Sequence, residues 1–363
     1  MNTDISHQTS AVSGSRSRSA ARARVHSIAA AALTTVLALL ACHDASTSPD
    51  GGGDSGPPAG MASCVGNAYL TRSPVALSAL QWIVPLGNLN PTGHVFPSDH
   101  IYLWATTPPS GSPTPVVSPG NVVVTQAGRQ TNSGGGQPTT TDYILRFYPC
   151  SDVSFYFYHL TSLTPELLAQ IGSFDGGCNP TYVTGGRTYQ QCYVNTEIPL
   201  AAGAPIGTMG TAAGGMFDLG GYDRRVAPLA YVNPARSLGA STNQTICPVD
   251  YFVPAVADSM RAILGGWNGH RTVTPLCGSV MQDLANTAQG RWFFNAATNE
   301  DPHLALVHDN VNPTLGAFSV GTSISSLPPG VYDFTPAATG RVNADFSRVT
   351  ADGNIYCYEG LGF

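Results

Sequence analysis

The chain has 363 residues, of which 42% are hydrophobic and only 10% are charged, and its formal net charge is −6. All 16 basic residues are arginines, because the sequence contains no lysine. A net negative chain lacks the cationic surface on which phosphate binding depends, so the composition argues against a nucleic-acid partner. The 40 glycines and 28 prolines favour short strands and turns, and they predict a mainly β protein.

Residues 1–41 predict a lipoprotein signal peptide. Several arginines precede the apolar stretch 28–40, which is shorter than the roughly 20 residues of a membrane-spanning helix. The stretch ends in Leu-Leu-Ala-Cys, which resembles the bacterial lipobox and implies lipidation of Cys42 and a lipid anchor to the membrane. The alternative is an ordinary signal peptide with an incidental cysteine. Since His43 is not the aspartate associated with inner-membrane retention, we expect an exported protein of the cell envelope, with the outer membrane preferred over the inner.

The segment 42–60 contains almost nothing that could pack, and it predicts a flexible linker. A folded β domain is expected over 61–240. Its strands are predicted where apolar and β-branched residues gather, at 80–85, 100–105, 122–125, 143–148 and 153–159. The Gly, Thr and Gln-rich stretch 126–141 predicts a long loop or hairpin tip, and 165–171 one short helical turn.

A second, β-rich module of unassigned role is expected over 245–363. The segment 173–196 before it is predicted to be an excursion from the sheet that a disulfide closes. The stretch 250–264 is the only one that predicts a longer helix. The strands expected in the C-terminal module are short and lie at 291–294, 304–307, 317–320, 331–334 and 354–358.

Seven cysteines follow Cys42, and in an exported protein they are best interpreted as disulfide partners, because no CxxC metal-binding spacing occurs. Two local pairs are predicted, Cys178 with Cys192 and Cys247 with Cys277. The odd number leaves one thiol that is either free or paired between molecules.

Five spaced segments carry a family resemblance: GHVFPSDHIYLW (93–104), PVVSPGNVVV (115–124), FYFYHLTSL (155–163), PLAAGAPIGTMG (199–210) and MFDLGGYD (216–223). The order and the residues of these segments resemble the core of the lysostaphin and LytM-type zinc peptidases, peptidase family M twenty-three. The resemblance covers roughly residues 80–234. It implies an antiparallel sheet of the lysostaphin-like (duplicated hybrid motif) type, with a groove across which an extended peptide could lie.

The family holds one zinc ion with a His and an Asp from an HxxxD motif and the second His of an HxH motif. Under this resemblance His94 matches the first ligand, and either Asp99 or His100 could face the metal, since they follow at five and six residues where the family spaces four. Neighbours on a strand point to opposite faces, so only one of the two is expected there. The alternative is structural: a loop histidine that caps a turn and a strand histidine bonded within the sheet.

In the family, a further His in a Tyr-x-His-Leu segment and the first His of HxH assist the attacking water. His159 matches this catalytic histidine, but Met216 and Asp218 stand at the two HxH positions. Asp218 could still bind a metal, because carboxylate is a normal zinc ligand. Two imidazoles and one carboxylate are also used by non-haem iron, although no cosubstrate motif supports iron here.

Other polar residues have simpler interpretations. His303 and His308 could supply the missing histidine, but they are more simply strand-end residues beside a turn at 309–310. The run 223–225, Asp-Arg-Arg, indicates an ion-paired surface turn rather than a clamp for a peptide carboxylate.

The sequence therefore supports two functions. The first is a divergent zinc peptidase-like lipoprotein of the bacterial cell envelope, with Zn²⁺ as cofactor, peptidoglycan or envelope peptides as substrate, and His159 as acid or base. The second is a non-catalytic envelope binding module that kept the peptidase fold and groove. The retained histidines favour the first, and the broken HxH motif favours the second, because it removes a ligand and a proton-transfer group.

Overall fold

The computed structural model describes residues 56–106, 112–184, 186–210, 215–236, 242–297 and 299–361. The predicted signal peptide, Cys42 and most of the predicted linker lie outside these residues. Within the described ranges, no helix is long and apolar enough to cross a membrane.

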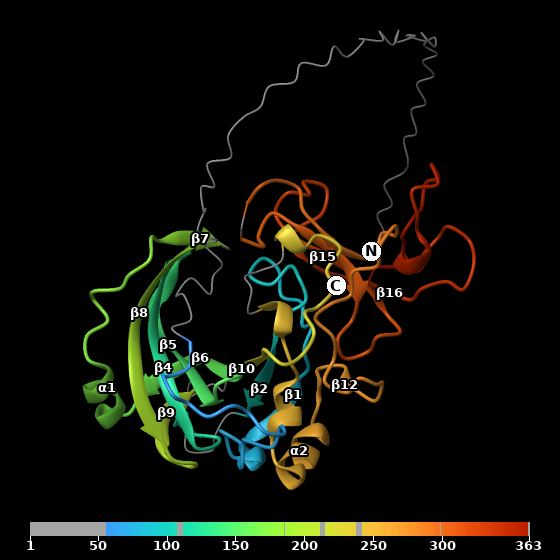
Figure 1. Cartoon of the computed structure of the whole chain (residues 1–363). Helices are drawn as coiled ribbons and strands as arrows, with labels where there is room; N and C mark the ends of the chain where they lie inside the picture. The colour runs from blue at the N-terminus through green and yellow to red at the C-terminus, as the bar shows by residue number, and fades with distance from the viewer. Residues whose placement is uncertain are drawn as a thin grey trace, which may run out of the picture. The chain divides into compact units, whose positions relative to one another are not determined.

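The protein is mainly β, as predicted, and its largest element is an antiparallel ten-stranded sheet. Along its main path the strands are β1 (Leu80–Val84), β2 (His100–Ala105), β10 (Gly215–Asp223), β6 (Val153–Leu163), β5 (Gln137–Cys150), β4 (Val122–Gly134), β8 (Arg187–Leu200) and β7 (Tyr182–Thr184). Two further strands, β3 (Thr114–Val117) and β9 (Pro205–Met209), pair with each other beside this path, and β9 also pairs with β6. Figure 1 shows β4, β5 and β8 as long neighbouring strands.

For 126–141 the hairpin alternative is confirmed and the loop alternative is wrong, because β4 and β5 continue through this stretch as a paired hairpin with its turn at 135–136. The strand β4 has a partner on each side, β5 and β8, so its polar residues gain backbone hydrogen bonds that composition does not reveal. The predicted excursion at 173–196 likewise contains β7 and most of β8. Long polar strands in this sheet are therefore stabilised by pairing rather than by an apolar pattern.

The predicted short helix is confirmed as α1 (Pro165–Ile171). It begins at Thr164, whose side chain accepts a hydrogen bond from the Leu167 N–H, and Pro165 occupies the first turn, where no donor is needed. The longer helix expected at 250–264 is instead split into the 3-10 turn η4 (Pro248–Tyr251) and α2 (Pro254–Arg261). The proline at the start of α2 keeps the preceding residue extended, and this ends the first turn.

A separate four-stranded antiparallel sheet forms after residue 289, from β13 (Gly290–Trp292), β14 (Leu304–His308), β15 (Gly316–Val320) and β16 (Gly330–Phe334). These confirm four predicted strands. The fifth, at 354–358, makes only an isolated bridge between Cys357 and Val342, because its backbone bonds to a loop. The remaining elements are β11 (Gly265–Gly266), β12 (Gly269–His270), η1 (Leu77–Ala79), η2 (Pro234–Arg236), η3 (Thr242–Gln244) and η5 (Phe346–Arg348).

The main core lies against one face of the ten-stranded sheet. Aromatic rings from three adjacent strands meet there: Phe157 lies 4.7 Å from both Phe147 and Phe217, measured between ring centroids. The same core includes Val249 and Met260, from η4 and α2. Residues on both sides of the predicted boundary at 240–245 thus share one core, and the boundary itself stays a prediction.

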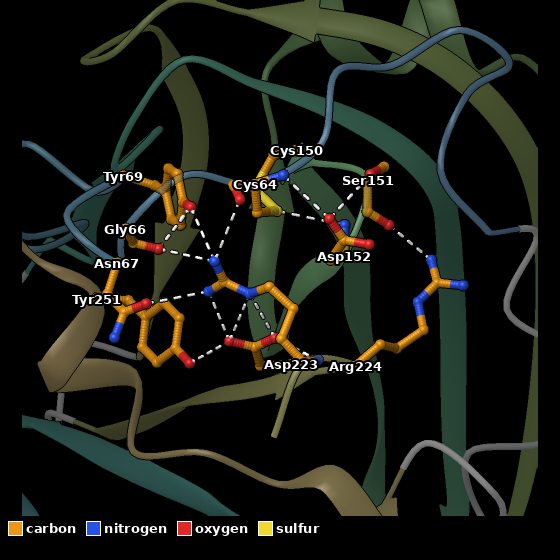
Figure 2. Close-up of a disulfide and its surroundings, with 11 residues drawn as sticks. Cys64, Gly66, Asn67, Tyr69, Cys150, Ser151, Asp152, Asp223, Arg224 and Tyr251 are labelled. Atoms are coloured by element: carbon orange, nitrogen blue, oxygen red, sulfur yellow. Dashed lines mark hydrogen bonds and ion pairs between the residues drawn. A yellow bond between two sulfur atoms is a disulfide. The ribbon is translucent and has the colours of Figure 1, made fainter. Parts of the chain in front are cut away.

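The described residues form three disulfides, and two of them are the predicted local pairs, Cys178–Cys192 and Cys247–Cys277. The third, Cys64–Cys150, joins positions 86 residues apart and ties the start of the folded body to the end of β5. Figure 2 shows this disulfide with Asp152 beside it. Cys357 is free and exposed, so it is the odd thiol among the described cysteines.

Next to this disulfide, the run 223–225 forms an ion pair as predicted, but its carboxylate is buried rather than on the surface. Asp223 is 1% exposed and accepts hydrogen bonds from Arg225 and from the Tyr251 hydroxyl, at 2.7 and 2.5 Å (Figure 2). The Arg225 guanidinium also donates to the Gly66 carbonyl and to Asn67. Burial alone would raise the pKa of Asp223, but Arg225 and Tyr251 outweigh it and hold this pKa below its usual range.

Replacing Arg225 by alanine should lower the free energy of unfolding by about 2 to 3 kcal/mol, because a buried carboxylate loses its cation. Arg224 is the matched control. Its guanidinium donates at the exposed surface to the Ser151 carbonyl, so Arg224→Ala should cost under about 1 kcal/mol. Denaturant unfolding of the two variants measures the difference, and equal losses would contradict the role given to Asp223.

Candidate functional site

The candidate site lies on the sheet face opposite the aromatic core. Because side chains alternate along a strand, Ile101 and Phe217 point into the core while their neighbours His100 and Asp218 point the other way. A cavity of about 300 Å³ covers this face. It is lined by all five residues predicted as metal ligands or catalytic group: His94, Asp99, His100, His159 and Asp218.

The carboxylate of Asp218 occupies the centre of this group. It lies on β10, between β2 and β6, and is 3% exposed. Its Oδ2 is 3.4 Å from Nε2 of His100 and 3.5 Å from Nε2 of His159. Its Oδ1 is buried without a hydrogen-bond partner among the described residues. Histidines from the two strands that flank β10 thus approach a single carboxylate oxygen.

Asp99 contacts the ring nitrogen of His100 that faces away from Asp218, which is Nδ1. Its Oδ1 is 3.0 Å from Nδ1 of His100 and accepts from the Tyr156 hydroxyl at 2.8 Å, and its Oδ2 accepts from the Tyr222 hydroxyl at 2.6 Å. Burial would raise the pKa of Asp99, but His100 and the two tyrosines outweigh it and hold this pKa far below its usual range. As an anionic acceptor, Asp99 places a proton on Nδ1 of His100 and leaves Nε2 directed at Asp218.

The expectation that Asp99 and His100 point to opposite faces is therefore wrong. Asp99 lies in the bend before β2, which begins at His100, so strand alternation does not apply to it. Both side chains belong to one cluster, with His100 next to Asp218 and Asp99 one hydrogen bond further away.

Gly220 makes room for this arrangement. It is paired with Tyr156 on β6 and with His100 on β2, and a Cβ at this position would lie 2.1 Å from the Tyr156 ring. Any larger residue would displace the tyrosine whose hydroxyl holds Asp99. The glycine after Asp218 and Leu219 is thus required by the close approach of the ring.

His159 is directed into the cluster by an irregularity of β6. The pairing of β5 with β6 shifts between Tyr143 and Leu145, and His159 there has a φ of 64°, an uncommon value for a residue other than glycine. Its Nδ1 lies 3.2 Å from Oδ2 of Asp142. Burial would lower the pKa of His159, but Asp218 and Asp142 outweigh it and raise this pKa to about 9.

His94 belongs to a loop that the C-terminal sheet holds in place. Its backbone pairs with Asn90, and its ring centroid is 5.2 Å from that of His100. The next residues, Val95 and Phe96, are buried against Ala305 and Val307 of β14. Burial, followed by the nearby His100, lowers the pKa of His94 to about 4, so this imidazole is neutral at pH 7.

The donor set partly fits a metal ion. Nε2 of His100 and Oδ2 of Asp218 are both acceptors when Nδ1 carries the proton, and two acceptors 3.4 Å apart repel unless a cation or proton lies between them. Ligands of a tetrahedral zinc ion lie roughly 3.3 to 3.6 Å apart when the bonds are about 2.0 to 2.2 Å. However, no group of three or more His, Cys, Asp or Glu side chains in the described ranges is arranged so that it could hold a metal ion.

Two other predicted candidates lie elsewhere. His303 is 1% exposed, stacks on Phe96 and lies 3.2 Å from the Ala297 carbonyl, while His308 pairs with Asp345. Neither lines the cavity, so neither replaces the missing HxH histidine, and their structural interpretation is supported. Met216 does line the cavity, where it offers no group that can transfer a proton.

Sequence reasoning missed several residues of the site. Asp142 directly precedes a predicted strand whose hairpin partner ends at His159, but counting back from the turn at 151–152 does not place the two opposite each other, because Cys150 pairs with Val153 and Tyr143 with Leu160. Three other missed residues come from outside the resembling region: Arg291, Asn299 and Glu300 also line the cavity. Nothing in the spacing of the sequence pointed to these three.

Comparisons of the chain with protein-family models, with curated proteins and with solved structures find no match. The family resemblance therefore depends on the residues of this chain alone.

Glu300 is a buried acid that also lines the cavity. It is 8% exposed and accepts a hydrogen bond from the Phe96 N–H at 2.7 Å. Burial raises its pKa to about 8, well above the ordinary value of about 4.3 expected in the unfolded chain. The folded protein therefore keeps a proton that the unfolded chain releases.

Stability should accordingly fall between about pH 5 and pH 8, by up to roughly 1.4 kcal/mol per pH unit from this group, and level off above the folded pKa. Glu300→Gln keeps an acceptor for the Phe96 N–H and removes the titration. Unfolding free energies measured at pH 5 and pH 8 should show a smaller fall for the variant than for the native protein. The same fall in both proteins would show that Glu300 is ionised in the folded state.

Proposed function

We propose that the protein is a divergent zinc-dependent peptide hydrolase of the bacterial cell envelope, related to the lysostaphin and LytM-type peptidases and anchored by lipid at Cys42. The observation that carries this proposal is the approach of two imidazole Nε2 atoms, on His100 and His159, to one oxygen of Asp218. Residues scattered from position 94 to position 218 line one cavity, as a catalytic site requires.

In this proposal His94, His100 and Asp218 hold the metal. Its contribution would be to lower the pKa of a bound water and to polarise the peptide carbonyl. Asp99 orients His100 through Nδ1, and Tyr156 and Tyr222 hold Asp99, so the imidazole does not have to reorganise.

His159 is the proposed acid or base. Asp142 contacts its Nδ1, so Nε2, which lies 3.5 Å from Asp218, would be the atom that exchanges a proton, and the pKa of about 9 makes it a proton donor to the departing amine at pH 7. Peptidoglycan peptides or other envelope peptides are the proposed substrates, because the cavity lies over an antiparallel sheet face lined by tyrosines.

The chain departs from the family pattern in a way that supports this donor set. Under the resemblance, His100 stands where the family has its aspartate, and Asp218 stands where it has the second histidine of HxH. The two residue types are exchanged between neighbouring strands β2 and β10. Two imidazoles and one carboxylate are therefore available, as in the family.

The second candidate is a non-catalytic module that binds a peptide in the same cavity. Met216 favours it, because a residue without a transferable proton stands where the family has its other assisting histidine. In that case the buried polar cluster would serve recognition and stability alone.

Metal content separates the two. The purified chain, equilibrated with Zn²⁺ and then dialysed, should retain about one zinc ion per molecule by plasma mass spectrometry. Asp218→Asn should lose it, and Asp99→Asn should weaken zinc affinity roughly 10- to 100-fold through His100. His308→Asn is the control, because that histidine pairs with Asp345 outside the cavity and should keep the zinc. A native protein without zinc would remove the metal from the proposal.

Hydrolysis tests the role of His159. Release of peptides from purified sacculi, or cleavage of synthetic wall peptides, should fall roughly 10²- to 10⁴-fold in His159→Asn. Asparagine tolerates the positive φ of this position, so the bulge is retained while the imidazole is lost. The exposed His270, changed to asparagine, should leave the rate unchanged. Activity that survives in His159→Asn would exclude this residue as the acid or base.

A further inference from the structure

Arg291 brings a guanidinium to the cavity from the C-terminal sheet. It lies on β13, and its side chain is only 6% exposed. It lines the same cavity as His94, His100, His159 and Asp218. Its charge is balanced by an ion pair with the equally buried Asp283 carboxylate, which does not form a hydrogen bond with the guanidinium.

The contacts of Arg291 leave its hydrogen-bonding capacity largely unused. Its Nε and Nη2 are buried and have no hydrogen-bond partner among the described residues. The nearest carboxylate oxygen, Oδ1 of Asp283, lies 3.7 Å from Nε, beyond hydrogen-bond distance. The Asp283 carboxylate accepts instead from the backbone N–H groups of Arg291 and Val232.

Aromatic rings hold the guanidinium in position. Its central carbon is 3.6 Å from the centroid of the Tyr231 ring, with Phe96 and Phe293 at 5.6 and 5.9 Å. Stacking on a ring fixes the plane of a guanidinium but uses none of its N–H groups, which lie at its edge. A guanidinium held in this way is pre-organised for a planar anion that accepts two parallel hydrogen bonds.

We propose that Arg291 binds a carboxylate of the ligand, so that the cavity selects peptides with a free carboxylate close to the bond that faces Asp218 and His159. Carboxylate is the anion that a peptide offers, at its C-terminus or on an acidic side chain, and its geometry matches the guanidinium fork. Glu300 does not compete for this role, since burial raises its pKa to about 8 and keeps it neutral at pH 7. The identity of the reacting bond rests on the proposed hydrolase function, whereas carboxylate binding does not.

The test compares two probes that differ only in charge: N-acetyl-alanyl-alanine and the same dipeptide with a C-terminal amide. Isothermal titration calorimetry with the purified chain should give an affinity for the acid roughly 10- to 100-fold above that for the amide. In Arg291→Gln the two affinities should become equal, through loss of binding to the acid. Equal binding of both probes by the native protein, or no binding of the acid, would overturn the proposal.

Two further variants separate recognition from folding. Arg291→Lys keeps the charge and the packing stem but loses the planar fork, so it should stay folded and lose most of the discrimination. Arg236→Gln is the matched control, because that guanidinium stacks on Phe293 but already donates to the carbonyls of Asn295 and Ala297 and does not line the cavity. It should leave both affinities unchanged, and a loss of discrimination equal to that of Arg291→Gln would overturn the proposal.

Hydrolysis of the same probes keeps the two proposals distinguishable. If neither the dipeptides nor purified sacculi are cleaved but the acid binds through Arg291, the hydrolase function fails and carboxylate recognition stands. If both are cleaved with equal kcat/KM, carboxylate recognition fails and the hydrolase function stands.

Discussion

The site depends on one electrostatic constraint: the Asp218 carboxylate is buried in the middle of a sheet and must be compensated by its neighbours. Removal of a carboxylate from water costs several kcal/mol unless opposite charge and hydrogen bonds replace the lost hydration. Here the nearest groups are the Nε2 atoms of His100 and His159. The positions of both histidines, and of the residues that orient them, follow from this requirement.

Each imidazole that contacts Asp218 has a second carboxylate on its other nitrogen. His100 is held by Asp99, and His159 by Asp142. The paired carboxylates fix the orientation of both rings, and at His159 the charges of Asp218 and Asp142 outweigh burial and raise the pKa to about 9. The result is an alternating row of acids and bases across β5, β6, β10 and β2, in which a change at one residue alters the charge balance of the next.

The C-terminal sheet contributes residues to the cavity and packs against the loop that carries His94. Val95 and Phe96, which follow His94, pack against Ala305 and Val307, and Glu300 accepts a hydrogen bond from the Phe96 N–H. Arg291 lines the cavity from the same sheet. The module whose role the sequence left unassigned therefore holds the His94 loop and contributes a cation to the cavity.

What the sequence could predict follows from which interactions are local. Short apolar strands such as β2 and β14 and the helix α1 were predictable, because alternation and capping act within a few residues, and two disulfides were predictable because they close loops of only 14 and 30 residues. The polar lengths of β4, β5 and β8 were not, since their strands form through partners up to 78 residues away, as in the pairing of Val122 with Leu200. The hydrophobic pattern of a strand does not predict which distant strand it pairs with.

The candidate site divides in the same way. His94, His100, His159 and Asp218 were found because motifs preserve order along the chain, whereas Asp142 and Arg291 were missed because their roles arise only from strand pairing and from packing of a distant sheet. The chemistry of a site depends on where its ligating atoms lie in space and not on their order in the sequence. An aspartate and a histidine exchanged between adjacent strands can therefore break both halves of a motif and still present the same atoms to one cavity. Under the proposed resemblance, Met216 is the one position where no such exchange restores the lost group, so the proposed hydrolysis would depend on His159 for proton transfer.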